Sequence, residues 1–170
     1  IMPLRVLGLE GGTINDINQA ILYAARLSNA SGRLPAKRAD IINMSLGGGG
    51  FSQGQQDVIT QARTQGIIIV ASAGNEAQQG NPIGYPAAYE GVVSVGAVGM
   101  DRSRASYSSF NAFVDIAAPG GDTSRDQDGD GYPDGVLSTG GDDSNGELEF
   151  VFNFQQGTSM AALHVAGVAA

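Results

Sequence analysis

The chain has 170 residues, a formal net charge of -8 at pH 7 and no cysteine. This length suits one domain that buries about 70% of the surface its unfolded chain would expose. Only nine Lys and Arg residues are present, and they are scattered, which argues against nucleic acid or an anionic membrane as the main partner, because phosphate binding needs clustered positive charge. The lack of cysteine excludes disulfides, thiolate-bound zinc and a thiol nucleophile.

Charged residues make up 15% of the chain, against a usual share of about 25%, and glycine occurs 26 times. This composition is typical of a Gly-rich globular enzyme. No apolar run reaches the length of about 20 residues that a membrane helix needs. The chain begins at Ile1 and stops within an Ala-rich helical pattern, so we expect it to be an internal piece of a longer protein.

The first half of the chain predicts alternating strands and helices. PLRVLGL at 3–9 predicts a short strand, and apolar residues at helical spacing predict a helix within 11–32. Thr13 and Asp16 form a capping box at the start of that helix. IINMSL at 41–46 is an uninterrupted apolar pattern, typical of a strand buried on both faces.

A second helix is predicted between a capping serine at Ser52 and a stop glycine at Gly66. The apolar run at 67–73 follows at once. Strand, helix and strand with short joints indicate a βαβ unit, which is a right-handed crossover within a parallel sheet. Further strands are predicted at 92–98 and 113–120. The sequence therefore predicts an α/β fold.

The stretch at about 120–146 is acidic and Gly-rich, which predicts a long functional or metal-ordered loop. Within it, DQDGDGYPDG matches the first nine positions of an EF-hand-type calcium loop, with Gly131 at the sharp turn. The five ligands would be Asp126, Asp128, Asp130, the carbonyl of Tyr132, and Asp134. Leu137 stands where a bidentate Glu is expected, so another oxygen must complete the shell. The candidates for it are Asp122, Asp142 and Asp143. The sequence predicts bound Ca²⁺; the alternative is a solvated acidic turn.

Five motifs follow one another along the chain. They are INMSLGG (42–48), ASAGNE (71–76), YPAAYEGVVSVGAV (85–98), YSSF followed by VDIAAPGG, and GTSMAALHVAG (157–167). In this order and spacing they resemble landmarks of the subtilisin-like serine proteases, above all of secreted bacterial members. The resemblance covers nearly the whole chain. It implies a doubly wound, mostly parallel sheet with helices on both faces. It also implies that residues 1–170 are a partial peptidase domain, truncated at the amino-terminal side.

Ser159 is the candidate nucleophile that this resemblance selects. Gly157 permits a tight turn and Thr158 can cap a helix, which would place Ser159 in the first helical turn. There its backbone N–H has no partner within the helix, and the helix dipole favours a developing negative charge. The alternative is that Ser159 is only a helix-start residue.

Asn75 is the candidate oxyanion donor. It follows IIIVASAG, at the carboxyl end of a strand, where open α/β sheets place ligand sites. A side-chain amide there can donate a hydrogen bond to an oxyanion, and the resemblance assigns Asn75 that role. The alternative is an ordinary turn, since glycine and asparagine both suit turns.

The resemblance also implies a substrate-binding cleft. One wall of the pocket for the substrate side chain would be the backbone of Ala71, Ser72, Ala73 and Gly74. The other wall would be Gly84, with Glu76 near the rim, where its carboxylate would tolerate Lys or Arg beside the scissile bond. The substrate backbone would pair with an extended segment formed by Ser45, Leu46, Gly47 and Gly48. The Tyr85–Pro86 bond would be cis.

His164 is the only histidine in the chain. Five residues of helix rotate its side chain by about 140° from Ser159 and shift it by about 7.5 Å, so it cannot be the base for Ser159. We expect a packing role, with a hydrogen bond that holds the imidazole. The family's catalytic Asp and His lie in Asp-Thr-Gly (or Asp-Ser-Gly) and His-Gly-Thr-His contexts, and neither motif occurs here. The chain alone is therefore expected to be inactive.

Two functions follow as hypotheses. The first is the carboxyl-terminal part of the catalytic domain of a secreted, calcium-stabilised endopeptidase that acts through an acyl-enzyme on Ser159. Its partners would be a polypeptide substrate, the missing amino-terminal segment and, through uncovered apolar surface, further copies of the chain. The alternative is a non-catalytic calcium-binding or protein-interaction module on a degenerate protease fold.

Overall fold

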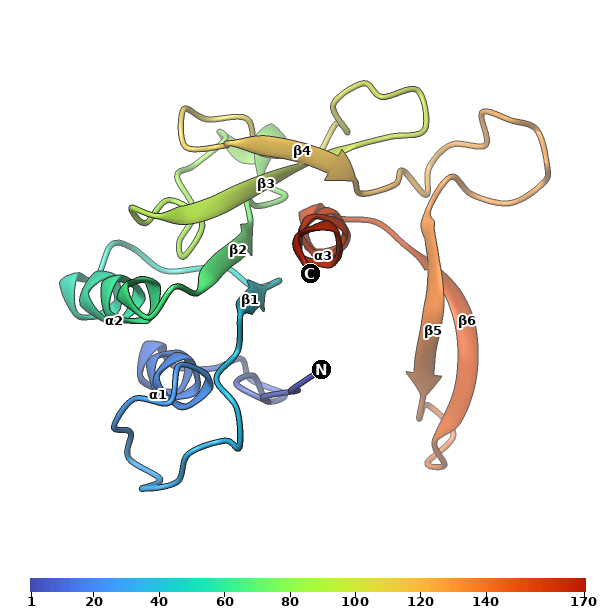
Figure 1. The fold of residues 1–170 in the computed structure, drawn as a ribbon. Helices are drawn as coiled ribbons and strands as arrows, with labels where there is room; N and C mark the ends of the chain where they lie inside the picture. Colours follow the sequence, from blue (N-terminus) through green and yellow to red (C-terminus); the bar gives the residue numbers. More distant parts are fainter.

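A computed structural model describes residues 1–170. Its centre is a parallel sheet of strand order β1-β2-β3-β4, with helices on both faces (Figure 1). The strands are β1 (Ile41–Met44), β2 (Ile68–Ser72), β3 (Val92–Val98) and β4 (Ile116–Pro119). The helices α1 (Ile14–Ala24) and α2 (Gln53–Thr64) lie on one face, and α3 (Thr158–Ala169) lies across the other. This is the doubly wound α/β arrangement that the sequence predicts.

The sheet is continuous because each strand pairs with the next one in the chain. Ile41 of β1 lies opposite Ile68 of β2, and Ile69 of β2 lies opposite Val92 of β3. All three pairings are parallel, and α2 connects β1 to β2. The βαβ unit is thus confirmed, and the carboxyl ends of β1 and β2 lie side by side.

Both predicted N-cap side chains, Thr13 in α1 and Ser52 in α2, accept a hydrogen bond from the first turn of their helix. The backbone N–H of Asp16 donates to Thr13 Oγ1 over 3.1 Å, and that of Gln55 donates to Ser52 Oγ over 3.4 Å. However, α1 ends at Ala24, well before residue 32. Arg26 takes a positive φ of 57°, and the side chain of Asn29 bonds the backbone of the following turn, which competes with further helix.

The strand predicted at 3–9 is wrong. These residues form no strand, and only an isolated bridge joins Gly8 to Gly11. A strand requires a hydrogen-bonded neighbour, and no segment pairs with residues 3–7. Leu4 and Leu7 remain largely exposed as a result.

β1 is less buried than its apolar sequence indicates. Only Met44 is fully buried, and the other three residues are half-buried. β1 is an edge strand, so it lacks a neighbour on one side. The buried strands are the inner ones, where Val70 of β2 and Val95 of β3 are completely covered.

The region predicted as one long loop at about 120–146 contains a strand in its second half. β5 (Val136–Asp142) pairs in antiparallel fashion with β6 (Glu149–Gln155). This hairpin stands apart from the parallel sheet and leads into α3 (Figure 1). The alternating phenylalanines of EFVFNFQ carry the period-two signal of a strand.

Two clusters of buried side chains form the core, one on each side of the sheet. Ile59 and Ala62 of α2 pack with Ile69 of β2 on one side. On the other side Ala161 and Ala162 of α3 pack against Val95 of β3. The small side chains of α3 let the helix approach the sheet closely, which positions its N-terminus beside the ends of the strands.

Several large apolar side chains remain on the surface. Leu163 and Val168 of α3 are 53% and 90% exposed, and Ile116 on the edge strand β4 is 48% exposed. No helix has both the length and the apolar character needed to cross a membrane.

Candidate active site

Ser159 lies in the first turn of α3, as the sequence predicts, and is half-buried. The helix is preceded by Gly157, whose φ of 148° and ψ of 159° are accessible essentially only to glycine. The backbone N–H of Ser159 has no acceptor within the protein. It is therefore a free donor at the positive end of a helix dipole.

Asn75 follows β2 and reaches the N-terminus of α3. Its Oδ1 accepts hydrogen bonds from the backbone N–H of Thr158 (2.9 Å) and from Thr158 Oγ1 (3.0 Å). Because Asn75 Oδ1 faces Thr158, the Nδ2 group of the same amide is turned towards Gly157. A Cβ placed on Gly157 would lie 3.5 Å from Asn75 Nδ2 and 3.7 Å from Ser159 N. Two donors thus border one space that the missing side chain keeps open.

Thr158 has a role different from the predicted one. It is the first residue of α3 rather than its cap, and it is completely buried. Its Oγ1 accepts from Gly74 N over 3.2 Å and donates to Asn75 Oδ1. The capping oxygen comes instead from Asn75, because Gly157 in the cap position has no side chain. A contact between residues so distant in the chain has no local sequence signal.

The segment predicted to pair with the substrate backbone is hydrogen-bonded to the backbone of Ser159. Ser45 Oγ donates to the carbonyl oxygen of Ser159 over 2.8 Å and accepts from Asn43 Nδ2 over 3.0 Å. Leu46 accepts from Ser72 Oγ over 3.4 Å, and Gly48 N donates to Tyr85 O over 3.1 Å. These bonds hold Ser45–Gly48 beside both α3 and β2.

The two segments predicted as walls of the side-chain pocket lie next to each other. A Cβ on Gly84 would lie 3.4 Å from the carbonyl oxygen of Ala73, so the two backbones approach closely. Ala71, Ser72 and Ala73 are buried. The Tyr85–Pro86 bond next to this wall is cis, as the resemblance implies.

Glu76 is exposed beside this wall, and its Oε2 accepts from the backbone N–H of Asn75 over 2.7 Å. The same oxygen would lie 2.5 Å from a Cβ on Gly74, whose φ is 111°. Glycine at this position therefore lets the carboxylate fold back over the strand end. The negative charge lies beside Asn75, near the rim of the predicted cleft.

His164 does not contact Ser159. Its Nδ1 donates to the carbonyl oxygen of Met160 over 2.9 Å, one turn back along α3. The predicted hydrogen bond is present, but the predicted packing role is wrong, because the side chain is exposed on the outer surface of the helix. Leu163, which precedes His164, is also exposed, and the helix continues past it to Ala169.

The acidic loop gathers three of its five predicted ligands. Asp126, Asp128 and Asp130 place one carboxylate oxygen each within 4.8 Å of the others, and all three are exposed. Asp126 accepts from the backbone N–H groups of Gly129 and Gly131, which shapes the turn. The donor set is all oxygen, the kind that Ca²⁺ prefers, so these three residues fit that ion.

The other predicted ligands lie differently. Asp134 is buried and its Oδ2 accepts from Gln127 N over 2.9 Å, at the base of the loop. Asp122 forms an ion pair with Arg125 at 3.1 Å. Asp142 ends β5 and Asp143 follows it, roughly 20 Å along the strand from Val136. The hairpin carries these two residues away from the loop, so neither can complete the shell.

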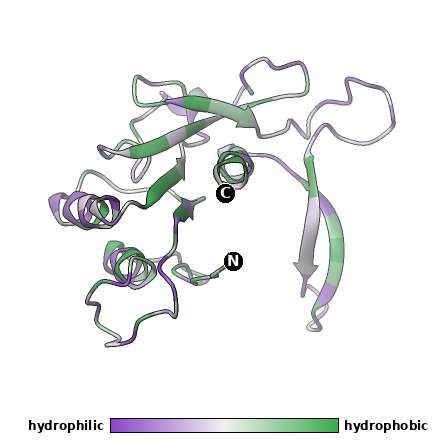
Figure 2. Cartoon of the chain, viewed as in Figure 1, coloured by the Kyte–Doolittle hydropathy of each residue, from purple (hydrophilic) through white to green (hydrophobic).

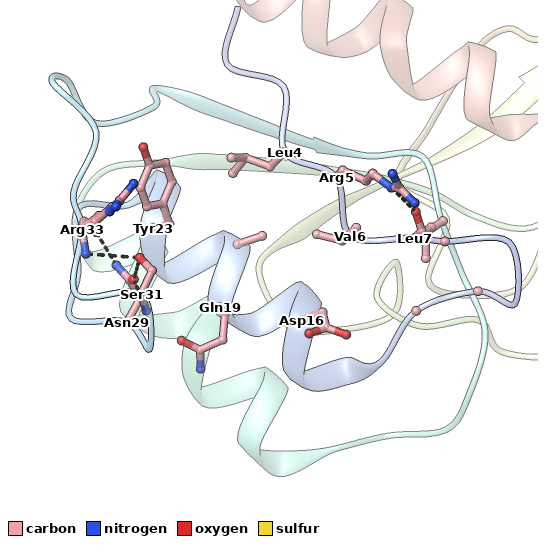
Figure 3. A pocket seen from close by; sticks show the side chains of 14 residues that line it. Leu4, Arg5, Val6, Leu7, Asp16, Gln19, Tyr23, Asn29, Ser31 and Arg33 are labelled. Carbon is pink, nitrogen blue, oxygen red and sulfur yellow. Dashed lines mark hydrogen bonds between the residues drawn. The ribbon is translucent and has the colours of Figure 1, made fainter.

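One cavity lies away from the predicted site, whereas another, of about 530 Å³, is lined by Leu46, Gly47 and Gly48 of the predicted substrate-binding segment. A cavity of about 600 Å³ lies between residues 4–12, α1 and the turn at 29–33 (Figure 3). Arg5 and Asp16 line one part of it and Tyr23 and Arg33 another, and Asn29 donates to Arg33 O. None of the predicted site residues lines this cavity. Residues 4–8, which form no regular strand, make up one of its walls.

Comparison with known proteins agrees with this fold. The sequence profile described as the subtilase family matches residues 1–170. The chain belongs to the subtilase family of serine proteases.

Individual relatives support this assignment. The chain is 37% identical over 172 residues to an "Extracellular protease" of Xanthomonas campestris pv. campestris, covering 100% of the chain and 27% of that protein. It is 37% identical to "Subtilisin DY" of Bacillus licheniformis, covering 100% of the chain and 52% of the relative.

Solved structures give the same result. A protease from Pseudoalteromonas arctica has a TM-score of 0.84 and 41% sequence identity, covering 97% of this chain and 48% of that one. A lanthipeptide protease has a TM-score of 0.76 and 26% identity, covering 99% and 54%. The chain therefore spans about half, or less, of the length of these relatives.

Proposed function

We propose that this chain supplies the nucleophile and the oxyanion-binding part of a secreted serine endopeptidase. The observation that carries the proposal is the open space at Gly157, bordered by Asn75 Nδ2 and Ser159 N. Two preorganised donors that meet at one point beside a serine suit the tetrahedral intermediate of acyl transfer. Extracellular action is supported by relatives whose names describe extracellular proteases.

In the proposed reaction Ser159 Oγ attacks the carbonyl carbon of a peptide bond while a base removes its proton. The carbonyl oxygen gains the negative charge and accepts from Asn75 Nδ2 and Ser159 N–H. As this intermediate collapses, the base gives its proton to the departing nitrogen, which leaves as the amine, and water then hydrolyses the acyl-enzyme on Ser159. The substrate backbone pairs with Ser45–Gly48, and its side chain enters between Ala71–Gly74 and Gly84.

The base is not among the residues near Ser159. The only histidine is bonded to Met160 O on the far side of the turn. Without a base, a serine nucleophile retains only the small residual rate that binding and the oxyanion donors supply. We therefore propose that the isolated chain has no measurable peptidase activity, and that an amino-terminal segment supplies the base and the acid that orients it.

Calcium binding is part of the proposal. Asp126, Asp128 and Asp130 would hold the ion with the carbonyl of Tyr132, and water would complete the shell. Bound Ca²⁺ would supply positive charge that offsets the repulsion between the three carboxylates, which would order the turn between Gly121 and Asp134. The ion takes no part in the proposed chemistry.

The test is a chimera in which the amino-terminal half of the Pseudoalteromonas arctica protease precedes residues 1–170. We expect the chimera to hydrolyse a chromogenic peptide and the isolated chain not to do so. Ser159→Ala should abolish the activity, and Asn75→Ala should lower kcat by about 10²–10³ with little change in KM. Circular dichroism verifies that each variant is folded.

Two results would contradict the proposal. A folded chimera without activity would favour the non-catalytic module, and hydrolysis that persists after Ser159→Ala would exclude this serine as the nucleophile.

For specificity, we expect peptides with Lys or Arg beside the scissile bond to be cleaved faster than those with Glu. Glu76→Gln should reduce this difference; equal cleavage of both by the unsubstituted chimera would rule out the assigned role.

A further inference from the structure

The β5–β6 hairpin presents one apolar face to solvent. Its register places Leu137 opposite Phe154, Thr139 opposite Phe152 and Gly141 opposite Phe150. Because side chains of opposed residues share a face, the apolar ones gather on one side of the hairpin. We call this the aromatic face, and it consists of Leu137, Phe150, Phe152 and Phe154.

The aromatic face is strongly exposed. Phe150 and Phe152 are 89% and 74% exposed, and Leu137 is 55% exposed. The hairpin stands apart from the parallel sheet, and β6 carries a run of hydrophobic colour (Figure 2). Contiguous exposed apolar surface on a soluble protein is characteristic of an interaction site. Two free strand edges accompany this face, since the hairpin has only two strands.

The charge around this face indicates the kind of partner. Residues 126–157 include six aspartates and two glutamates but neither lysine nor arginine. Asp142, Asp143, Glu147 and Glu149 are exposed at the tip of the hairpin. A ligand that complements this surface carries both apolar and cationic side chains. In an extended peptide, alternating apolar and cationic residues point to opposite faces.

The hairpin is joined directly to the nucleophile. β6 ends at Gln155, and Gln156 is anchored because its Oε1 accepts from Thr123 N (2.6 Å) and Thr123 Oγ1 (2.8 Å). From Phe152 to Ser159 there are seven residues, roughly 23 Å of extended chain at most. An extended peptide of similar length would reach from the scissile bond to the aromatic face.

The hairpin also lies on the opposite side of α3 from β1 and β2 (Figure 1). Ser45–Gly48 and Ala71–Gly74, which are proposed to bind the acyl side of the substrate, come from β1 and β2. The hairpin approaches α3 from the other side of that helix (Figure 1). The segment of substrate that follows the scissile bond would therefore leave towards the hairpin.

We propose that the aromatic face binds the leaving-group side of a polypeptide substrate, as an extended segment that alternates apolar and basic residues. The apolar side chains lie on Phe150 and Phe152, and the basic ones meet the carboxylates of Glu147 and Glu149. Backbone pairing along a free edge of the hairpin adds hydrogen bonds that do not depend on sequence. This inference rests on the proposed function, because it takes the occupant to be substrate.

The binding test uses the isolated chain and a fluorescein-labelled decapeptide of alternating Lys and Val. We expect a rise in anisotropy with this peptide and none with a decapeptide of alternating Glu and Val. Phe150→Ser combined with Phe152→Ser should weaken binding at least 10-fold. Phe113→Ser, which removes an exposed phenylalanine outside the hairpin, should leave the affinity unchanged. Glu147→Gln combined with Glu149→Gln should weaken binding and reduce its salt dependence.

In the binding and sedimentation experiments, four results would overturn the inference. Three of them are absence of binding, an equal loss of affinity with Phe113→Ser, and loss of binding in a folded chimera carrying Ser159→Ala, which would show that the protein's own amino-terminal segment covers the face. Sedimentation in which Phe150→Ser alone prevents dimers would also overturn it, since the occupant would then be a second copy.

Cleavage by the chimera separates this inference from the proposed function. We expect a Lys-Val extension after the scissile bond to lower KM at least fivefold, and the Phe150→Ser and Phe152→Ser pair to remove that gain. If short substrates are cleaved but the extension has no effect, the surface assignment fails and the function stands. If the chain binds the decapeptide but a folded chimera cleaves nothing, the proposed function fails and only a peptide-binding surface remains.

Discussion

Thr158 joins the end of β2 to the beginning of α3. Its completely buried hydroxyl accepts from Gly74 N and donates to Asn75 Oδ1, while its backbone N–H donates to the same oxygen. Two of these hydrogen bonds hold the side-chain amide of Asn75 relative to Ser159, and the third holds the Thr158 hydroxyl that donates one of them. The orientation of the candidate oxyanion donor depends on a residue that itself does not face the reaction.

Replacing Thr158 by valine tests this arrangement. Valine keeps the shape but removes the hydroxyl, which leaves the buried N–H of Gly74 without an acceptor. We expect Thr158→Val to lower the free energy of unfolding of the chain by about 1–3 kcal/mol, measured by urea denaturation. Thr158→Ser retains the hydroxyl and should cost less; an equal loss for both variants would show that packing of the methyl group matters instead.

Tyr107 provides a residue-scale prediction on pH. Its hydroxyl lies 2.9 Å from Gly120 O and 2.7 Å from Gly121 O, and burial raises its pKa to about 12. The unfolded chain ionises near the ordinary pKa of 10, whereas the folded chain keeps the proton. Stability is therefore unaffected by this group below pH 10 and decreases as the pH rises towards 12.

The expected measurement is a set of urea denaturation curves between pH 8 and 11.5. Tyr107→Phe should flatten the decrease in the free energy of unfolding above pH 10. Part of the decrease should remain, because burial also raises the pKa of Tyr89. An unchanged slope in Tyr107→Phe would mean that other groups cause the alkaline loss of stability.

At the scale of elements, one group of carboxylates lies in the acidic loop and a second group lies at the tip of the hairpin that follows it. Asp126, Asp128 and Asp130 cluster at the loop, whereas Asp143 lies at the far tip of the hairpin. Like charges in the cluster repel one another when no cation is bound. A cation at this point should therefore bind and stabilise the folded chain.

Calorimetric titration with Ca²⁺ tests this loop. We expect binding in the micromolar to millimolar range and a rise in Tm with added Ca²⁺. Asp126→Asn should weaken the affinity at least 10-fold, because it removes a ligand charge from the cluster. Asp143→Asn is the matched control and should bind normally. Absence of binding at millimolar Ca²⁺ would leave the loop as a solvated acidic turn.

Much of the element order follows from local sequence signals. The capping boxes at Thr13 and Ser52 and the apolar runs of β1 to β3 predict the βαβ core correctly, because caps and periodicity are local properties. The strand at 3–9 and the full burial of β1 are wrong, since both depend on which neighbours are present. The β5–β6 hairpin was missed because its acidic, Gly-rich first strand has the composition of a loop.

The candidate site likewise contains residues that local sequence motifs predict and contacts that they do not. Ser159 and Asn75 follow strong motifs, and the structure brings them together at Gly157. The bonds from Thr158 to Asn75 and from Ser45 to Ser159 join segments about 80 to 115 residues apart, so no local pattern announces them. Asp142 and Asp143 lie far from the loop because intervening residues form a strand.

At the scale of the whole molecule, α3 covers one face of the sheet but leaves apolar side chains in solvent. Leu163 and Val168 are exposed on its outer surface, and β1 has a free edge. Surfaces of this kind associate with a further segment or with another copy. The chain spans about half of the length of these relatives.

We therefore predict that the isolated chain self-associates and that the chimera does not. Analytical ultracentrifugation at increasing concentration should show dimers or larger species for residues 1–170. Leu163→Ser combined with Val168→Ser should shift the isolated chain towards monomer, whereas Phe113→Ser should not. A strictly monomeric profile at high concentration would contradict the prediction.

The most direct test of the central claim is covalent labelling of the chimera with a fluorophosphonate, followed by mass spectrometry of the peptides. Such a reagent reacts with a serine that has both a base and oxyanion donors. The account predicts one label, on Ser159, and strongly reduced labelling in Asn75→Ala and in the isolated chain. A folded chimera that is unlabelled, or labelled at another residue, would contradict it.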